Sequence, residues 1–256
     1  TYKFIPYFEV LNLRIIGLLV GSLIYFILGL HDDIYRSSPF LRLAIQFFGA
    51  LIVSLCGVNL SNIYFNFPFI GIVSLTLPII VAHIITCIWI VGITNAINWL
   101  DGLDALAAGH TLIILFGILL SANNLNNIEG VLILSVLSGS ILGFLIRNFK
   151  PALYIMGDCG SYFLGFCLST GAIYFSSENN QNSVSIIYLL VLFSLPILDM
   201  IFVLFNRIIG SFNPFMPDNN HIHHRMVRAK FEYNHIIFFI YFYSVLSALF
   251  ANIFIT

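Results

Sequence analysis

Residues 70–94 read IGIVSLTLPIIVAHIITCIWIVGIT, a run that contains no Asp, Glu, Lys or Arg. A helix needs about 20 mainly apolar residues to cross the hydrocarbon core of a bilayer, so this run predicts a transmembrane helix. Similar apolar segments recur along the chain, at about 10–30, 40–57, 70–94, 103–121, 129–146, 161–176, 184–205 and 236–255. We therefore expect an all-α, polytopic transmembrane helix bundle of about eight helices, which forms a single integral-membrane domain over residues 1–256.

The composition agrees with a membrane protein. Hydrophobic residues make up 60% of the chain and charged residues 8%, and the mean hydropathy is +1.01. Soluble proteins carry roughly 25% charged residues, so this chain has too few charges to cover a soluble globule. The balance of 10 Lys and Arg against 11 Asp and Glu leaves no basic surface. We therefore expect no nucleic-acid partner.

The positive residues predict the orientation of the bundle. Most Lys and Arg residues lie near the side reached after the first helix, namely Arg36, Arg42, Arg147, Lys150, Arg207, Arg225, Arg228 and Lys230. The loops expected on the opposite side, 58–69, 122–128 and 177–183, contain none. Loops rich in Lys and Arg face the cytoplasm. The loops that we expect on the cytoplasmic side lie near 31–39, 95–104, 147–160 and 206–235.

Acidic side chains gather on this same side. All Asp residues except Asp199 are expected there, namely Asp32, Asp33, Asp101, Asp104, Asp158 and Asp218. Ionisable residues are costly in a membrane protein and mark its functional sites. The clustering therefore predicts one site at the cytoplasmic surface, built from four polar motifs.

The first motif is the acidic pair Asp32-Asp33, at the end of the first apolar segment. Adjacent carboxylates repel each other unless a cation or a proton lies between them. The pair therefore favours a divalent ion such as Mg²⁺ or a basic partner. The alternative is that two solvated acids simply end a helix.

The second motif reads NAINWLDGLD over residues 95–104. Its carboxamides and carboxylates, Asn95, Asn98, Asp101 and Asp104, recur at every third position, so they line one face of a helical turn. Gly102 permits a sharp turn or the close approach of a ligand. Carbonyl and carboxylate oxygens are the ligands that Mg²⁺ prefers. The alternative is that Asp101 and Asp104 only cap the following helix.

The third motif, Gly157-Asp158-Cys159-Gly160-Ser161, precedes an apolar segment. It offers a carboxylate and free backbone N–H groups at a helix N-terminus, which is a place where proteins bind phosphate. As an alternative, Asp158 serves only as an N-cap.

The fourth motif is His221-Ile222-His223-His224-Arg225, in a long loop. A zinc site would need further Cys, His or carboxylate ligands, and no Cys is near in the sequence. Histidines beside Arg225, Arg228 and Lys230 suit an anionic substrate instead. A basic cluster that only contacts lipid headgroups is the alternative.

Together, the motifs indicate a reaction class. Acidic groups suited to Mg²⁺, a helix N-terminus and a His/Arg loop meet at a membrane surface. This combination favours transfer of a phosphoryl group from a charged soluble donor to a lipid acceptor.

The four motifs, in this order, resemble those of the polyprenyl-phosphate N-acetylhexosamine-1-phosphate transferases. The motif His-Ile-His-His-Arg at 221–225 is similar to that of the family branch whose members start O-antigen, common-antigen or teichoic-acid linkage synthesis. The resemblance implies a Mg²⁺-dependent membrane enzyme, for which Mn²⁺ can substitute. It implies that N-acetylhexosamine-1-phosphate, GlcNAc by default, passes from a UDP-sugar to undecaprenyl phosphate, with release of UMP. It further implies location in the bacterial plasma membrane with the site facing the cytoplasm.

The resemblance also implies roles for individual residues. Asn98 and Asp158 match the metal ligands, and Asp32 and Asp33 match the pair that positions or deprotonates the lipid phosphate. Asp101, Leu103 and Asp104 fall where the family handles the nucleotide. The remaining residues expected to bind substrate are Asn95, Arg42, His221, His223, His224 and Arg225.

Some features differ from the family pattern. Ala105 stands where the family usually has Gly, and Arg42 stands where it usually has Lys. The family has about ten or eleven helices, so we expect that its first two precede the segment at 10–30. The alternatives left open are a catalytically impaired fragment or scaffold of the same fold and, less favoured, a cation-coupled transporter with His83 and Asp199 at the midplane. The identity of the sugar and the choice between monomer and homodimer also remain open.

Overall fold

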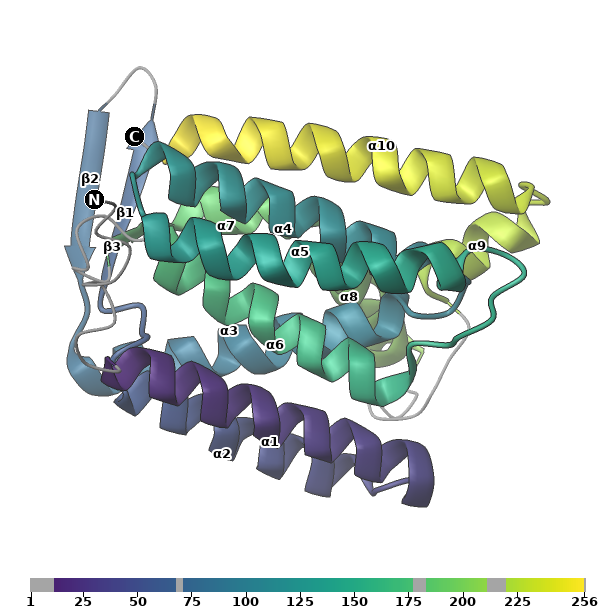
Figure 1. Ribbon diagram of the computed structural model, residues 1–256, viewed down its shortest axis with the longest axis horizontal. Coiled ribbons are helices and arrows are strands. Elements are labelled where there is room, and N and C mark those ends of the chain that lie inside the picture. Colours follow the sequence, from purple (N-terminus) through teal and green to yellow (C-terminus); the bar gives the residue numbers. More distant parts are fainter. Residues whose placement is uncertain (1–11, 68–70, 177–182, 211–219, 256) are drawn as a thin grey trace, which may run out of the picture.

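The computed structural model of the 256-residue chain describes residues 12–67, 71–176, 183–210 and 220–255. Long helices lie side by side along one direction (Figure 1). The helices are α1 (Leu13–Tyr35), α2 (Pro39–Leu55), α3 (Ile79–Leu100), α4 (Leu106–Asn124), α5 (Ile128–Asn148), α6 (Gly157–Phe175), α7 (Ile186–Leu192), α8 (Ser194–Ile209), α9 (Ile222–Arg228) and α10 (Tyr233–Ala251). Asp218 lies outside the described residues.

The prediction of a multi-pass helical membrane protein is confirmed. Within the described residues, α1, α3, α4, α5 and α10 are long and apolar enough to cross a bilayer. Helices α7 and α8 together form a sixth candidate span, which is bent by 75° at its break. The predicted segment at 184–205 is therefore a broken helix rather than a straight one.

A small sheet lies at one end of the bundle, and the sequence analysis did not predict it. It consists of β1 (Asn62–Phe67), β2 (Gly71–Thr76) and β3 (Ser183–Ser185), in the order β2-β1-β3. Strand β1 pairs antiparallel with β2 and parallel with β3. Helices α3 to α6 run alternately up and down the bundle (Figure 1), so they return the chain to the end at which β1 lies, and β3 pairs with β1 there.

The sheet corrects the predicted span at 70–94. Helix α3 begins only at Ile79, after Pro78, and the residues before it form β2. Proline disfavours helical backbone in the residue that precedes it, and the β-branched side chains of Ile72, Val73 and Thr76 favour a strand. Helix α3 still has 22 residues, because it continues to Leu100.

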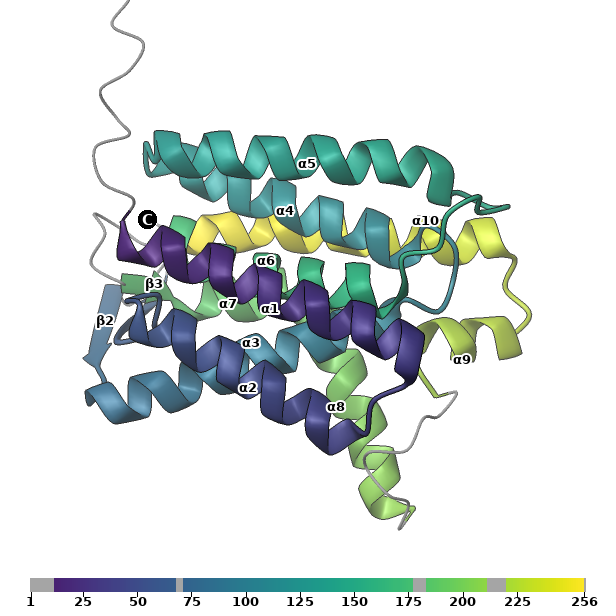
Figure 2. The same ribbon diagram turned by 60° about the horizontal axis from the view of Figure 1, so that its bottom comes forward.

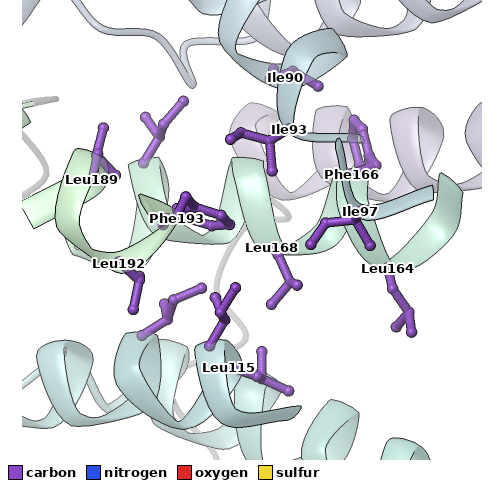
Figure 3. Close-up of a cluster of buried hydrophobic side chains, with 14 of the residues drawn as sticks. Ile90, Ile93, Ile97, Leu115, Leu164, Phe166, Leu168, Leu189, Leu192 and Phe193 are labelled. Carbon is purple, nitrogen blue, oxygen red and sulfur yellow. The ribbon is translucent and has the colours of Figure 1, made fainter. Parts of the chain in front are cut away.

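Helix α6 is the central element. It packs against α1, α3 and α4, and its side chains join a buried apolar cluster that includes Ile97, Leu115, Phe166, Leu168 and Phe193 (Figure 3). Helices α1, α5 and α10 instead expose many large apolar side chains on their outer faces. Such faces suit a protein whose solvent is lipid.

Glycines allow α6 to approach its neighbours closely. A side chain at Gly29 of α1 would overlap the backbone of Asp158 and Cys159, and one at Gly165 would lie 2.7 Å from the Cα of Thr94 on α3. Small residues at helix interfaces permit such backbone contact. As a result, the ends of α1, α3 and α6 come together within reach of short polar side chains.

Candidate active site

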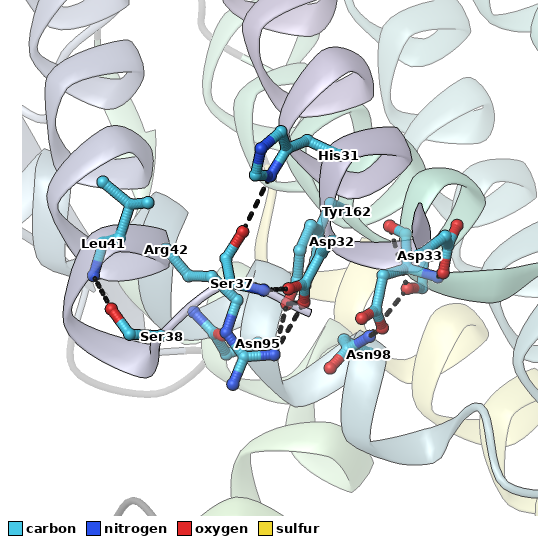
Figure 4. Close-up of polar contacts among 12 residues, drawn as sticks. His31, Asp32, Asp33, Ser37, Ser38, Leu41, Arg42, Asn95, Asn98 and Tyr162 are labelled. Carbon is cyan, nitrogen blue, oxygen red and sulfur yellow. Dashed lines mark hydrogen bonds and ion pairs between the residues drawn. The ribbon is translucent and has the colours of Figure 1, made fainter. Parts of the chain in front are cut away.

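The acidic motifs converge at the end of the bundle opposite the sheet (Figures 1 and 4). Helices α1 and α3 end there, and α2 and α6 begin there. The side chains that meet come from four helices and lie close together in space although they are far apart in the sequence, namely Asp32, Asp33, Arg42, Asn98 and Asp158. We call these side chains, together with Asp101, the acidic cluster.

Asp32 is buried and fully engaged. Its Oδ2 atom lies 2.7 Å from Nη1 of Arg42, and its Oδ1 atom accepts a hydrogen bond of 2.6 Å from the backbone N–H of Ser37. The hydroxyl of Tyr162 donates a longer hydrogen bond of 3.5 Å to Oδ2. The Arg42 side chain is 30% exposed, so this cation remains partly accessible at the surface of the protein.

Asp33 caps helix α6 from the neighbouring helix α1. Its Oδ1 and Oδ2 atoms accept hydrogen bonds of 2.8 and 3.0 Å from the backbone N–H groups of Asp158 and Cys159. The prediction of free N–H groups at this helix N-terminus was therefore wrong for these two. Gly157 has a φ of 64°, and a side chain there would lie 2.8 Å from the Asp33 carboxylate, so glycine is required for this approach.

Asp158 and Asn98 form the direct link between α6 and α3. The Nδ2 group of Asn98 donates hydrogen bonds of 2.6 Å to Oδ1 of Asp158 and 2.9 Å to Oγ of Ser161. Met156 is the N-cap residue of α6 and makes no side-chain capping bond, whereas Asp158 lies in the first turn. The alternative that Asp158 is merely an N-cap is therefore wrong.

The second motif does not keep to one face. Asn95 donates to Oε1 of Gln46 at 2.7 Å, and Asp104 accepts a 3.1 Å hydrogen bond from the N–H of Ala152. Helix α3 ends at Leu100, so the three-residue repeat loses its common face beyond Asn98. Leu103 packs against the apolar cluster of Leu100, Leu106, Leu195, Ile236, Ile237 and Ile240 instead of joining the acidic side chains.

The capping alternative for Asp101 and Asp104 is also wrong. Ala105 is the N-cap residue of α4, and it has no side-chain capping bond. Its φ of 61° lies in the left-handed region, which glycine adopts without steric cost. The buried N–H of Ala105 donates to Oδ1 of Asn148 at 2.9 Å. This hydrogen bond holds the turn although a side chain replaces the family's usual glycine.

Asp101 lies in a strongly negative environment. Burial, together with the charges of Asp158, Asp33 and Asp104, raises the pKa of Asp101 to about 7. The carboxylates therefore oppose one another's ionisation. Among the described residues, no three His, Cys, Asp or Glu side chains form a preformed metal cage.

We expect Asp101→Asn to stabilise the protein increasingly as the pH rises. The raised pKa means that a bound proton favours the folded state, so the parent loses this stability between about pH 4, near the ordinary value of 3.8, and pH 7. The neutral Asn avoids that loss, which is on the order of 2–4 kcal/mol. Thermal unfolding in detergent with EDTA, at pH 5 and pH 8, measures the difference. Glu232→Gln, at an exposed acid, is the control, and a difference that does not change with pH would contradict the prediction.

The fourth motif was predicted to lie in a loop, but His221 is the N-cap residue of α9 and residues 222–225 lie within this helix. We keep the name His loop for residues 221–225, which are anchored to α8. Nδ1 of His221 lies 2.9 Å from Oδ2 of Asp199, and the N–H of Ile222 donates a 2.7 Å hydrogen bond to Oδ1. Arg225 lies 3.7 Å from Asp199 and stacks over the ring of Phe202, with 3.9 Å from Cζ to the ring centroid.

The His loop contacts the loop between α3 and α4. The imidazole of His223 is buried and fills the space where a side chain at Gly102 would lie. His224 packs beside it, with ring centroids 4.1 Å apart. Burial and the neighbours His224 and His221 lower the pKa of His223 to about 4, although Asp199 acts in the opposite direction. His223 is therefore neutral at pH 7 and lies next to the acidic cluster.

The sequence of the acidic part of the site matches a known family. A sequence profile of glycosyl transferase family 4 matches residues 15–176, which include Asp32, Asp33, Asn98 and Asp158. The chain belongs to glycosyl transferase family 4. This assignment agrees with the resemblance found from the motifs alone.

Curated relatives within glycosyl transferase family 4 extend the similarity over most of the chain. A probable undecaprenyl-phosphate N-acetylglucosaminyl 1-phosphate transferase of Bacillus subtilis is 34% identical over 89% of this chain and 62% of its own length. A decaprenyl-phosphate N-acetylglucosaminephosphotransferase of Mycobacterium leprae is 32% identical over 88% of this chain and 61% of its own length. A phospho-N-acetylmuramoyl-pentapeptide-transferase of a Thermoanaerobacter species is 30% identical over 86% of this chain and 70% of its own length. The chain thus spans about three fifths of the length of the first two relatives.

The structure adds residues that the motifs of glycosyl transferase family 4 did not reveal. Asp199 was predicted to lie within a membrane helix, with no role assigned beyond that of a structural partner, and in the structure its Oδ2 atom lies 2.9 Å from Nδ1 of His221. Trp99 contacts both the His221 ring, at 5.3 Å, and the Arg207 guanidinium, at 5.1 Å. The pairing of Trp99 with α8 has no local signal in the sequence, because it depends on tertiary packing.

Proposed function

We propose that this protein transfers N-acetylhexosamine-1-phosphate, by default GlcNAc-1-phosphate, from a UDP-sugar to undecaprenyl phosphate and releases UMP. The observation that supports this most is that two groups of side chains lie at the same end of the bundle. Asp32, Asp33, Asn98 and Asp158 form the first group. The His loop is the second, and its His223 contacts Gly102. The names of the relatives, which specify polyprenyl-phosphate acceptors and N-acetylglucosaminyl phosphate transfer, support the same reaction.

In the proposed reaction, an oxygen of the lipid phosphate attacks the phosphorus that carries the sugar. The bond between the two phosphates of the donor breaks, and UMP leaves with the bridging oxygen. Arg42 beside Asp32 is suited to bind the lipid phosphate, because its guanidinium is partly exposed. Asp33 holds the start of α6, so that Asp158 stays at the centre of the acidic cluster.

We propose Asp158 and Asn98 as the residues that hold Mg²⁺, for which Mn²⁺ can substitute. Their carboxylate and carboxamide are suitable donors. Burial, with a further contribution from the charges of Asp158, Asp33 and Asp104, raises the pKa of the nearby Asp101, which is consistent with a place for a cation. Mg²⁺ commonly uses one or two protein carboxylates and completes its shell with water and substrate phosphates. When bound, the ion would neutralise charge that develops on the phosphates.

The His loop would bind the donor. His221 and Arg225 are held on Asp199. Neutral His223 packs against Gly102 in the Asp101–Asp104 turn, and His224 packs against His223. This turn, with Leu103, would contact the nucleotide. The excess of Lys and Arg at this end supports a cytoplasmic site in the bacterial plasma membrane, with initiation of a cell-surface polysaccharide as the biological role.

We expect UMP release only when UDP-sugar, undecaprenyl phosphate and Mg²⁺ are all present. Purified protein in detergent is assayed for UMP with UDP-GlcNAc, UDP-GalNAc, UDP-QuiNAc and UDP-FucNAc, each with and without the lipid and with EDTA. Release that requires the lipid and disappears with EDTA would support the reaction and the metal, and the panel would identify the sugar. Absence of UMP release with every donor would overturn the proposal.

A further inference from the structure

Asp199 is a buried acid with three partners in or next to the His loop. It accepts a hydrogen bond from the N–H of Ile222, contacts Nδ1 of His221 at 2.9 Å and lies 3.7 Å from Arg225. Its own side chain is only 2% exposed. A buried carboxylate of this kind is costly unless its partners stay in place, so its contacts fix the start of α9.

Helix α8 has two different faces. Asp199, Val203 and Arg207 are buried and follow one another at four-residue spacing, which places them on one side of the helix. Large apolar side chains such as Ile201 and Phe205 are more than half exposed on the rest of its surface. Figure 2 shows α8 leaning away from the other long helices, and the 75° break separates its direction from that of α7.

A second contact connects α8 to the acidic motif. The guanidinium of Arg207 lies 5.1 Å from the ring of Trp99, and that ring lies 5.3 Å from His221. The buried face of α8 therefore contacts the His loop through Asp199 and contacts the end of α3 through Arg207. Both contacts hold His221 close to the acidic cluster.

We infer that Asp199 is a positioning residue for the donor: it holds His221 and the first turn of α9 so that the His loop packs against Gly102. This inference rests on the proposed function, because it concerns binding of the UDP-sugar. Asp199 itself lies behind His221 and acts through it. The buried face of α8 thus serves as the support on which the donor-binding side chains are arranged.

The test compares Asp199→Asn with the parent in two measurements. Loss of a charge-assisted buried hydrogen bond should raise the KM for the UDP-sugar roughly ten- to hundredfold, and leave the KM for undecaprenyl phosphate within about twofold. Hydrogen exchange of the amides in α9 should become about tenfold faster or more. Asp199→Glu keeps the carboxylate and should recover part of the donor affinity.

Two further variants separate positioning from general damage. Leu198→Ala, at the exposed neighbouring residue, should leave the donor KM and the exchange of α9 unchanged. The double variant Asp199→Asn/His221→Asn should lose little more than His221→Asn, because the two residues act together. Should Asp199→Asn fail to fold, Asp199→Glu and His221→Asn are compared instead. A donor KM for Asp199→Glu that lies closer to the parent than that of His221→Asn supports the positioning role, and one that does not contradicts it.

The outcomes distinguish this inference from the proposed function. Unchanged exchange in α9, or an equal rise in the KM of both substrates, would overturn the positioning role. A parent protein that releases no UMP would overturn the proposed function, while the exchange measurement would still decide whether Asp199 holds α9.

Discussion

Asp158→Asn should lower the rate of UMP release by roughly a thousandfold or more, while the protein stays folded. The amide oxygen of Asn can still accept the hydrogen bond from Asn98 that Asp158 Oδ1 accepts at 2.6 Å. The negative charge, however, is lost at the residue proposed to hold the metal. Electrostatic stabilisation of phosphoryl transfer by a bound ion contributes several kcal/mol, which corresponds to such a factor. The rate is measured as UMP release with saturating substrates.

The control for this variant is Cys159→Ala, one residue away. It keeps the backbone N–H that donates to Asp33 at 3.0 Å, so the rate should stay within about twofold of the parent. Circular dichroism and gel filtration establish folding for both variants. An Asp158→Asn protein that retains more than about a tenth of the parent rate would refute the assignment.

Gly102→Ala should lower kcat/KM for the UDP-sugar by roughly a hundredfold. The new methyl group would overlap the imidazole of His223, which is buried. His223 cannot simply move aside, because His221, which precedes it by two residues, is anchored on Asp199. A misplacement of about 1 Å in a catalytic arrangement can cost such a factor. The constants come from initial rates at varied donor concentration.

A matched glycine tests whether the overlap is the cause. Gly143 in α5 has open space where its side chain would lie, and Gly143→Ala should leave activity unchanged and stabilise the helix by about 1 kcal/mol. The double variant Gly102→Ala/His223→Ala should be no less active than His223→Ala alone. A double variant that is much weaker would show that Gly102 is required for another reason.

The positions of the helices could be predicted from the sequence, because membrane spans carry their signal in their own composition. The side of the bundle that carries the acidic residues could also be predicted. Successive spans run in opposite directions, and the acids lie in the segments that fall on one side. The sheet could not, because β1 and β3 pair across a long stretch of chain. The strand β2 was hidden within an apolar run that satisfied the requirement for a spanning helix.

The different contacts of the neighbours Asp32 and Asp33 could not be predicted from the sequence either. Successive residues of a helix point about 100° apart, so Asp32 contacts Arg42 on α2 while Asp33 contacts the backbone of α6. The sequence pattern suggested a divalent ion or a basic partner for the pair, and Arg42 is such a basic partner for Asp32. Only the packing of α1 against both α2 and α6 reveals that each acid has its own partner.

The pairing of Asn62 with Ser183 also has a consequence for biogenesis. During synthesis, the β1–β2 hairpin is complete before α3 to α6 have been made, and a two-stranded hairpin alone is marginally stable. Strand β3 can join it only after those four helices have been inserted and arranged. The sheet therefore closes late in assembly, and its formation reports that the helices which carry the second and third motifs are already in place.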